Sequence, residues 1–260
     1  MILKWKEIRR RIIFNIKYNY FPELEIRIPI SDKLTAPIPF KDSYDSFSEI
    51  FFRSEYDEIL EGIQTPNTWI DMGCHMGYFS LWIENRRQKE KKGLSESKVL
   101  LIDGDKRSEV GIKQLKNCNP ILREWKYIHG VISSPKDTVI FEQNDYMSSS
   151  ILKENTTIKN TYKVPVISQE DILGEKTSII DLVKVDIEGA EWELLEHYQS
   201  ILKNTKYLLM EWHSWHSGGK GKNQILEALT KLSFKLIKEI VPHGDASTFT
   251  DVGLILAERQ

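Results

Sequence analysis

The stretch Trp69-Ile70-Asp71-Met72-Gly73-Cys74-His75-Met76-Gly77-Tyr78-Phe79 decides the fold of this chain. A short apolar run ends in the acid Asp71, and a turn with two glycines leads into a helix-like segment. Gly73 can adopt a positive φ and lets the backbone approach a ligand closely, while Gly77 would let the new helix pack tightly on the strand. The first turn of that helix has backbone N–H groups without intrahelical partners. The stretch therefore predicts a strand–turn–helix unit with a ligand site at the turn.

Strand-like and helix-like segments alternate on both sides of this unit. Short apolar runs occupy residues 68–71, 98–103, 126–132, 179–186 and 206–211. Helical segments occupy residues 78–91, 106–117, 189–203 and 222–232. This alternation predicts an α/β fold with a mostly parallel sheet and helices on both of its faces. The last two apolar runs, 234–241 and 250–257, should form a hairpin, which gives the sheet an antiparallel edge.

Two internal segments are less regular. Residues 46–62 predict a helix that leads to the breaker pair Thr65-Pro66. Residues 137–167 interrupt the alternation and predict an insertion of short strands and loops. Ligands in open α/β sheets bind beyond the carboxyl ends of the strands, and an insertion placed there often covers the site.

The residues before Asp45 predict an extension of the main domain. Apolar residues recur near helical spacing among basic ones, which predicts an N-terminal helix; they are Ile2, Trp5, Ile8, Ile12 and Ile16. We expect this helix to cover the domain, and the alternative is a contact with an anionic membrane surface or a glycosyltransferase partner. Residues 23–30 alternate as in a strand, and Pro37 and Pro39 indicate a loop.

The composition limits the class of protein. The 260 residues, 40% hydrophobic and 28% charged, fit one soluble globular domain. A formal net charge of -2 excludes the overall basic field of a dedicated nucleic-acid binder. Cys74 and Cys118 are expected as free thiols in a reducing compartment. No secretory signal pattern and no run of about 20 apolar residues occur, so we expect a cytoplasmic protein.

Acids end two further predicted strands. Asp103 closes the run 98–103, and Asp186 and Glu188 follow the run that begins at residue 179. In nucleotide-binding α/β folds the acid after the second strand reaches the ribose hydroxyls, so Asp103 is the predicted ribose ligand. Each acid alone could equally stabilise a helix N-terminus. Three strands that end in acids at one crevice favour an acidic ligand site.

The glycine spacing and Asp71 favour one ligand over another. A nicotinamide dinucleotide calls for G-x-G-x-x-G with pyrophosphate at the helix N-terminus. A carboxylate about 4 Å from a phosphate charge costs roughly 4 kcal/mol at an effective dielectric of 20. S-adenosylmethionine has a sulfonium, an ammonium and a ribose diol but no phosphate, so an acidic pocket suits it.

These stretches resemble the FkbM-type methyltransferase family from Asp45 to the C-terminus. IIDLVKVDIEGAEWELLEH at 179–197 is the most specific and is similar to the family signature after the fourth strand. WIDMGCHMGYFSL at 69–81 resembles the cofactor loop, with His75 where a small residue or Asn is usual. LIDGDKRS at 101–108 resembles the second-strand motif, with Asp103 in place of the more common Glu and no proline after it. DSFSEIFFRSEY at 45–56, MSSSIL at 147–152 and LLMEWHS at 208–214 resemble further family segments.

The resemblance implies a Rossmann-like class I methyltransferase fold with seven strands, the last of them antiparallel. It also implies S-adenosylmethionine as cofactor and O-methylation of a sugar hydroxyl in a glycan or glycosylated natural product. We predict a methyltransferase domain at 45–260 after an extension at 1–44. The predicted cofactor-binding residues are Glu49, Tyr56, Asp71, Gly73, His75, Gly77, Tyr78, Phe79, Asp103, Gly104, Val131 and Asp186.

A general base would take the proton of the acceptor hydroxyl. The candidates are Asp186, Glu188, Glu211 and His213, and His213 ranks first because an imidazole titrates nearest neutral pH. A divalent ion held by these residues and His216 is the alternative. Two histidines three apart are common by chance, so we assign no metal ion. Trp212 and Trp215 are expected to be open to the acceptor and Trp192 to lie in the core. A mobile glycine-rich loop at 217–221 is expected beside His213.

The acceptor is predicted to be a glycan or small molecule, with no nucleic acid. Two other functions remain open. An RNA or protein methyltransferase on the same fold would bind its substrate with strong salt dependence in the RNA case. A non-catalytic module would bind cofactor without turnover. A dehydrogenase is disfavoured by Asp71.

Overall fold

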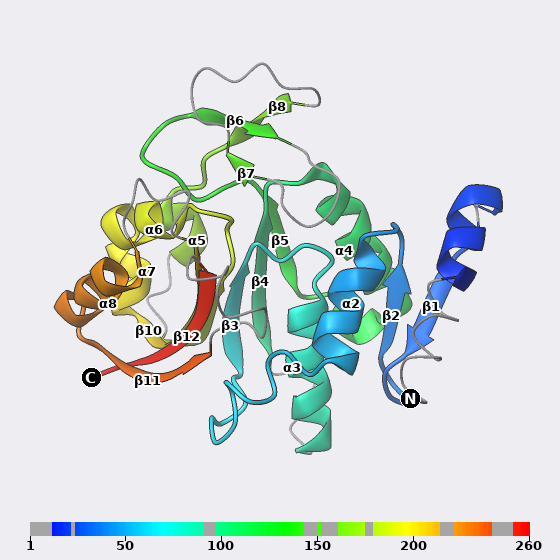
Figure 1. Ribbon diagram of the computed structural model, residues 1–260, viewed down its shortest axis with the longest axis horizontal. Coiled ribbons are helices and arrows are strands. Elements are labelled where there is room, and N and C mark those ends of the chain that lie inside the picture. Colours follow the sequence, from blue (N-terminus) through cyan, green and yellow to red (C-terminus); the bar gives the residue numbers. More distant parts are fainter. Residues whose placement is uncertain are drawn as a thin grey trace.

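The computed structural model describes residues 12–21, 24–90, 97–142, 150–151, 161–174, 179–213, 221–240 and 252–260. A seven-stranded sheet runs through its centre with helices on both faces (Figure 1). The strands of this sheet are β3 (Thr68–Met72), β4 (Lys98–Asp103), β5 (Lys126–His129), β9 (Ile180–Val185), β10 (Thr205–His213), β11 (Phe234–Ile240) and β12 (Val252–Arg259).

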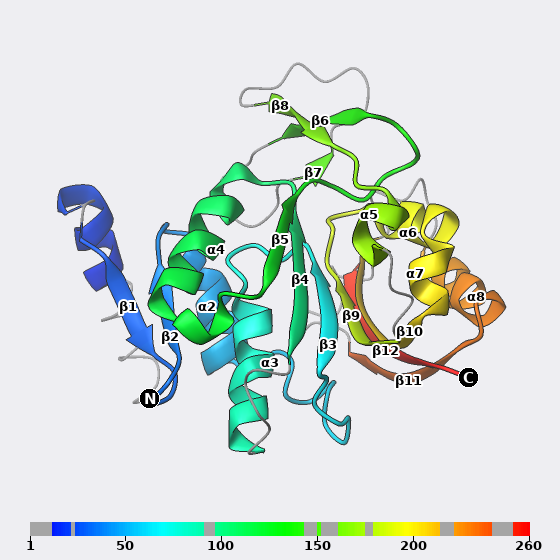
Figure 2. The ribbon, with the colours of Figure 1, turned by 180° about the vertical axis from the view of Figure 1, so that it is seen from behind.

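The strand order is β11-β12-β10-β9-β3-β4-β5, and the run from β5 to β9 can be followed in Figure 2. The pairs from β10 to β5 are parallel. β12 is antiparallel to both of its neighbours, β10 and β11. The predicted terminal hairpin is therefore confirmed, and the antiparallel strand lies one position inside the edge of the sheet.

Alternating side chains along the strands feed two apolar cores. Trp69 of β3 belongs to the core under α2 (Ser43–Phe52), α3 (Tyr78–Lys89) and α4 (Lys106–Cys118), whereas its neighbour Ile70 belongs to the opposite core. That second core lies under α6 (Glu191–His197), α7 (Gln199–Lys203) and α8 (Lys222–Lys231). The chain also forms the short α5 (Gln169–Leu173) and the 3-10 helix η2 (Pro120–Leu122).

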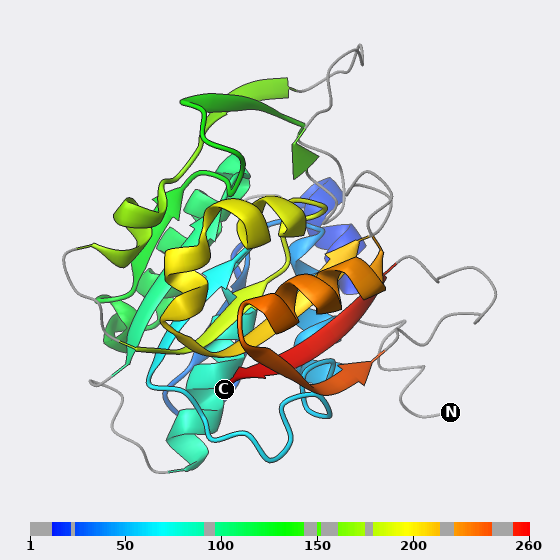
Figure 3. The ribbon, with the colours of Figure 1, turned by 90° about the vertical axis from the view of Figure 1, so that its left-hand side faces the viewer.

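The insertion at 137–167 forms a separate small sheet in the order β7-β6-β8, which stands beyond one end of the main sheet (Figure 3). Its strands are β6 (Thr138–Glu142), β7 (Ser150–Ile151) and β8 (Thr161–Pro165). Phe141 of β6 lies against Gly104, which directly follows β4; a Cβ atom on Gly104 would be 2.8 Å from the Phe141 ring. The small sheet therefore adjoins the carboxyl end of β4. Residues 147–149 and 152 of the predicted serine-bearing segment lie outside the described residues.

Three sequence predictions about local structure were wrong. The helix expected at 46–62 ends at Phe52, because Ser54 adopts a positive φ of 58° that an α-helix does not continue. Pro37, expected in a loop, lies in β2 (Thr35–Ile38). Among the described strands β2 pairs with β1 (Ile26–Pro29) alone, and a two-stranded sheet leaves edges that accept proline. The helix expected at 189–203 breaks at Tyr198 between α6 and α7.

The described part of the N-terminal extension is helical at residues 12–20. Its Phe14 ring stacks on Tyr44 with a centroid distance of 4.1 Å. Leu34, Ala36 and Ile38 around β2 are fully buried in the core that also holds α3. Residues before Asp45 thus contribute to the core under α2, α3 and α4. The domain boundary at residue 45 stays a prediction. In the described part of the chain, no helix has the length and apolar character needed to cross a bilayer.

Candidate functional site

The turn after β3 has space only for glycine at its first position. Gly73 has a φ of +72°, and a Cβ atom there would lie 1.6 Å from the carbonyl oxygen of Asp186. The N–H of Gly73 donates to the carbonyl of Ile102 at 2.9 Å, and the N–H of Asp186 donates to the carbonyl of Met72 at 3.0 Å. The carboxyl ends of β3, β4 and β9 therefore meet at this turn.

His75 and Gly77 complete the turn with positive φ values of 47° and 75°. Histidine and asparagine adopt this conformation more readily than most residues, which accounts for a histidine at this position. A Cβ atom on Gly77 would lie 2.7 Å from Ile112 and 2.9 Å from Leu115. Gly77 therefore allows α3 to approach α4 closely, in addition to its place in the turn.

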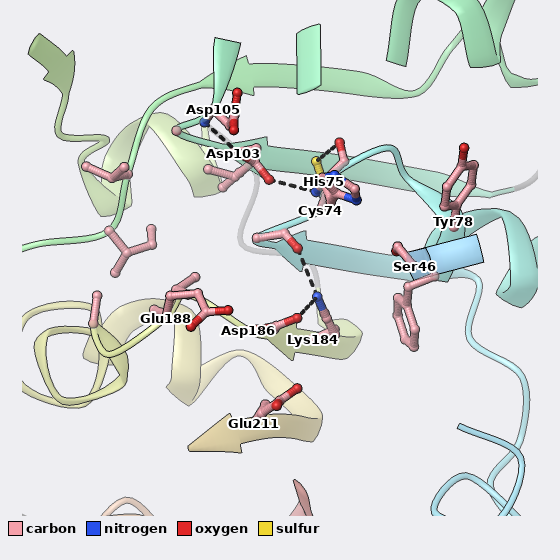
Figure 4. Close-up of a pocket in the computed structure, with 18 of the residues that line it drawn as sticks. Ser46, Cys74, His75, Tyr78, Asp103, Asp105, Lys184, Asp186, Glu188 and Glu211 are labelled. Carbon is pink, nitrogen blue, oxygen red and sulfur yellow. Dashed lines mark hydrogen bonds and ion pairs between the residues drawn. The ribbon is translucent and has the colours of Figure 1, made fainter. Parts of the chain in front are cut away.

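Asp103, the last residue of β4, connects two loops (Figure 4). Its Oδ2 accepts a hydrogen bond from the N–H of His75 at 2.7 Å, and its Oδ1 accepts one from the N–H of Asp105 at 2.7 Å. Burial raises the pKa of Asp103 to about 6, although these hydrogen bonds favour the charged form. Because a carboxylate has about four lone-pair positions, Asp103 keeps acceptor capacity for a ligand.

A cavity of about 330 Å³ opens at the carboxyl ends of these strands. The predicted cofactor residues that line it are Glu49, Tyr56, Gly73, His75, Tyr78, Phe79, Asp103, Gly104, Val131 and Asp186. Among the predicted catalytic residues, Asp186, Glu188 and Glu211 line it and His213 does not. Asp71 and Gly77 are also absent from its wall.

Asp71 lies beneath the cavity, contrary to the prediction that it contacts the cofactor. Its side chain is fully buried, and its Oδ2 accepts a hydrogen bond from the hydroxyl of Ser80 at 2.8 Å. Its Oδ1 lies 3.6 Å from the Nζ of Lys184. Burial raises the pKa of Asp71. Asp71 therefore acts on the site through Lys184 and not by facing the cavity.

Lys184, to which the sequence-based reasoning assigned no role, connects the acids around the turn. Its Nζ donates to the carbonyl of Gly73 at 2.9 Å and to Oδ2 of Asp186 at 3.1 Å. Burial lowers the pKa of Lys184, but Asp186 and Asp71 together raise it, so the ammonium stays charged. The sequence contained one signal of this role, a single lysine inside the apolar run Leu182–Val185. A lysine buried with such a run requires acidic partners.

His213 is 3% exposed at the end of β10 and is surrounded by carboxylates. Its Nδ1 lies 3.0 Å from Oε1 of Glu191, and its Nε2 lies 3.7 Å from Glu188 and 3.8 Å from Glu211. Burial lowers the pKa of His213, but the hydrogen bond to Glu191 and the nearby carboxylates raise it to about 9. Such a pKa favours the protonated ring at neutral pH and speaks against His213 as the general base, and its first rank among the candidate bases stays a prediction.

Three further carboxyl groups of the site have raised pKa values. Burial, followed by the charge of Asp186, raises the pKa of Glu188 to about 7. The same two causes raise the pKa of Glu211 well above its ordinary value. Burial raises the pKa of Glu49. Carboxyl groups at this end of the cavity therefore outnumber the two cationic side chains, Lys184 and His213, which favours a cationic ligand.

One set of potential metal ligands occurs within the described residues. Ligand atoms of Asp186, Glu188 and His213 all lie within 4.8 Å of one another. His216, which the sequence offered as a further ligand, lies outside the described residues, as do Trp215 and loop residues 217–220.

The aromatic residues differ in part from expectation. Trp212, expected to be open to the acceptor, is buried, and a Cβ atom on Gly253 would lie 2.7 Å from its Nε1. β10 places Trp212 and His213 on opposite faces, so the tryptophan packs in the second core. Trp192 is half-buried and donates to Glu196 at 2.5 Å. Cys74 and Cys118 are free thiols, as predicted.

Residues 95–237, more than half of the chain, match the methyltransferase FkbM domain family. No curated protein sequence matches the chain.

Solved methyltransferase structures are similar to the chain. Magnesium protoporphyrin IX methyltransferase (ChlM) from Synechocystis, solved with bound S-adenosylmethionine, is 8% identical, with 96% of each chain covered and a TM-score of 0.48. The N-methyltransferase NodS from Bradyrhizobium japonicum is 12% identical, with 83% of this chain and 97% of NodS covered and a TM-score of 0.45.

Proposed function

Because this chain belongs to the FkbM methyltransferase family, we propose that it methylates a hydroxyl group of a sugar, in a glycan or a glycosylated natural product, with S-adenosylmethionine as the methyl donor. The observation that carries this proposal is the acidic cavity, with Asp103 on one side and Asp186, Glu188 and Glu211 on the other.

The residues of the cavity fit the cofactor in size and in charge. A volume of about 330 Å³ lies within the range of small-ligand sites. Gly104 in the cavity wall lets Val131 and Phe141 pack directly on its backbone, since a Cβ atom there would lie 2.5 Å from Val131 and 2.8 Å from Phe141. The carboxylates of Glu49 and Asp186 would attract the sulfonium and ammonium groups, and Asp103 would accept hydrogen bonds from the ribose hydroxyls.

Bound S-adenosylmethionine would supply a methyl group activated by its sulfonium, and the electron pair of the carbon–sulfur bond would stay on sulfur when the methyl carbon passes to the acceptor oxygen. The chain must hold that oxygen about 3 Å from the methyl carbon and in line with the breaking bond. Glu188 and Glu211 line the same cavity and would orient the acceptor through hydrogen bonds to its hydroxyls. A carboxylate of the set Asp186, Glu188 and Glu211 accepts the hydroxyl proton.

The cofactor assignment is tested by calorimetric titration with S-adenosylmethionine, S-adenosylhomocysteine and NAD. We expect micromolar binding of the first two, no binding of NAD, and at least ten-fold weaker binding by an Asp103→Ala variant. An intact protein that binds neither methionine derivative would refute the proposal.

The acceptor class is tested by transfer of labelled methyl groups to a panel of glycosides, RNA and protein substrates. We expect label on glycoside oxygen and at least a hundred-fold loss of kcat in Glu188→Gln or Glu211→Gln. Glu227→Gln, an exposed acid on α8, is the matched control and should keep full activity. Label found only on RNA or protein would assign the second candidate function instead.

A further inference from the structure

Three side chains at the β9–β10 end of the cavity lie at separations that suit the ligands of one ion. Asp186 and Glu188 follow β9, and His213 ends β10. The Nε2 of His213 lies 3.7 Å from Oε2 of Glu188, and all three residues offer a ligand atom within 4.8 Å of the others. Around an octahedral ion with bonds of about 2.1 Å, adjacent ligand atoms lie about 3.0 Å apart and opposite ones about 4.2 Å apart. The distance from His213 to Glu188 exceeds the adjacent value by about 0.7 Å, so these two atoms would move closer together to bind one ion as adjacent ligands.

His213 has the second contact that metal-binding histidines usually have. Its Nδ1 lies 3.0 Å from Oε1 of Glu191, a fully buried residue. The same oxygen accepts a hydrogen bond from the N–H of Gly189 at 2.9 Å, which fixes the carboxylate. A histidine that binds a metal through one nitrogen typically donates the other N–H to such a carboxylate. Glu191 therefore orients the ring so that Nε2 faces Glu188 and Glu211.

The charges around His213 leave a place for a cation. Glu191 Oε2 is buried without a hydrogen-bond partner among the described residues. Glu211 Oε1 lies 3.8 Å from Nε2 of His213. Lys184 holds Oδ2 of Asp186 at 3.1 Å, which leaves that residue a second carboxylate oxygen. Four carboxylates thus surround one histidine and one lysine, and buried charge of this kind is stabilised by a paired or coordinated cation.

We propose that Asp186, Glu188 and His213 bind one divalent cation of the Mn²⁺ or Mg²⁺ type. The ion takes the place of the proton on Nε2 of His213, and Nδ1 keeps its proton toward Glu191. Two carboxylates and one imidazole give a mixed oxygen and nitrogen set, which suits a hexacoordinate ion that keeps several positions for other oxygens. The sequence analysis left a divalent ion as the alternative and assigned none, because two histidines three apart are common by chance, whereas the structure brings Asp186, Glu188 and His213 together from the ends of two strands.

The role of the ion rests on the proposed function. Its remaining positions would hold two neighbouring hydroxyl oxygens of the acceptor. The ion would lower the pKa of the coordinated hydroxyl and select which oxygen faces the methyl group. Glu211, which lines the cavity, then remains to accept the proton.

The test is titration of the full chain, freed of metal with EDTA and dialysed, with Mn²⁺ followed by electron paramagnetic resonance. We expect one saturable site per chain, a pulsed-resonance signal from a coordinated nitrogen, and at least ten-fold weaker binding by His213→Ala. His197→Ala is the matched control, because His197 lies 3.4 Å from Glu193 and 4.0 Å from Glu196 but is an exposed residue at the end of α6. This variant should bind Mn²⁺ as the wild type does.

The outcomes separate this proposal from the proposed function. No saturable Mn²⁺ site, or no nitrogen signal in the wild type, overturns the metal site even if His213→Ala does not fold. Undiminished binding by a folded His213→Ala does the same. S-adenosylhomocysteine binding in EDTA is measured alongside. If it occurs while Mn²⁺ does not bind, the metal site alone fails; if Mn²⁺ binds and the cofactor does not, the metal site stands and the methyltransferase assignment fails.

Discussion

The Nζ of Lys184 donates a hydrogen bond of 2.9 Å to the carbonyl oxygen of Gly73. A buried charge in β9 thereby holds the glycine turn that follows β3. The same Nζ lies 3.1 Å from Asp186 and 3.6 Å from Asp71. The turn and the acid after β9 therefore depend on one side chain for their relative position.

Replacing Lys184 by Met should lower the free energy of unfolding by about 3–5 kcal/mol, because it leaves Asp71 as a buried charge without its partner. Urea denaturation at pH 7 measures this loss. The double variant Lys184→Met with Asp71→Asn should recover part of it, since the uncompensated carboxylate is then gone. Lys203→Met, an exposed lysine at the end of α7, should change stability by less than about 0.5 kcal/mol. A loss at Lys184 no larger than at Lys203 would contradict the role of the network.

A comparison of Gly73 with Gly62 tests whether the turn after β3 has space for a side chain. Both have a positive φ, of 72° and 80°, but a Cβ atom on Gly62 meets nothing within 4 Å. Gly62→Ala should therefore cost only the backbone strain, about 1–2 kcal/mol. Gly73→Ala should cost more than about 4 kcal/mol or prevent folding, because the added carbon overlaps the backbone oxygen of Asp186. Thermal unfolding of both variants measures these losses of stability. Equal losses would mean that the backbone of Asp186 does not lie as close to Gly73 as the structure places it.

The protonation of Asp103 should govern cofactor affinity at low pH. Its pKa is raised to about 6, so the carboxyl becomes neutral as the pH falls below that value. A neutral acceptor forms weaker hydrogen bonds, so affinity for S-adenosylhomocysteine should drop by about ten-fold between pH 7.5 and pH 5. Calorimetry across this range measures it.

Asp103→Asn is the control for this pH dependence, because other acids of the cavity also titrate. The variant should bind more weakly at pH 7.5 and should lose less affinity as the pH falls. Parallel pH profiles for the variant and the wild type would show that another group is responsible.

Asn119 should be essential for attaching the N-terminal strands. Its Oδ1 accepts from the N–H of Thr35 at 2.8 Å, and its Nδ2 donates to the carbonyls of Thr35 at 2.7 Å and Leu115 at 2.8 Å. Asn119→Ala should cost about 2–3 kcal/mol in urea denaturation, because polar backbone groups lose their partners. Asn204→Ala, which loses one exposed hydrogen bond to Ser200, should cost at most about 1 kcal/mol. Similar losses would indicate that the strands do not depend on this contact.

Strand and helix positions were predictable because they depend on local periodicity. The runs at 68–71 and 98–103 match β3 and β4 within one residue. Predictions of helix length were wrong where a single residue interrupts the helix. Ser54 adopts a positive φ that ends α2. The hydroxyl of Tyr198 donates to the carbonyl of Ile167 at 2.7 Å, and at this residue the expected single helix breaks into α6 and α7. Neither feature has a local sequence signal.

The sequence by itself determined where the site lies. Parallel strands bring their carboxyl ends to one edge of a sheet. The acids at the ends of β3 and β4 and directly after β9 therefore had to lie near that edge. It also determined the family, because the segment that contains Asp186 and Glu188 is specific.

Only the tertiary structure decided what each acid does. Asp71 turns from the cavity toward Ser80 and Lys184, while Asp103 and Asp186 face the cavity. The pKa of His213 is raised because Glu191, 22 residues away in sequence, lies 3.0 Å from it. Protonation and orientation depend on burial and on charges brought together by long-range packing, and neither can be read from residue spacing.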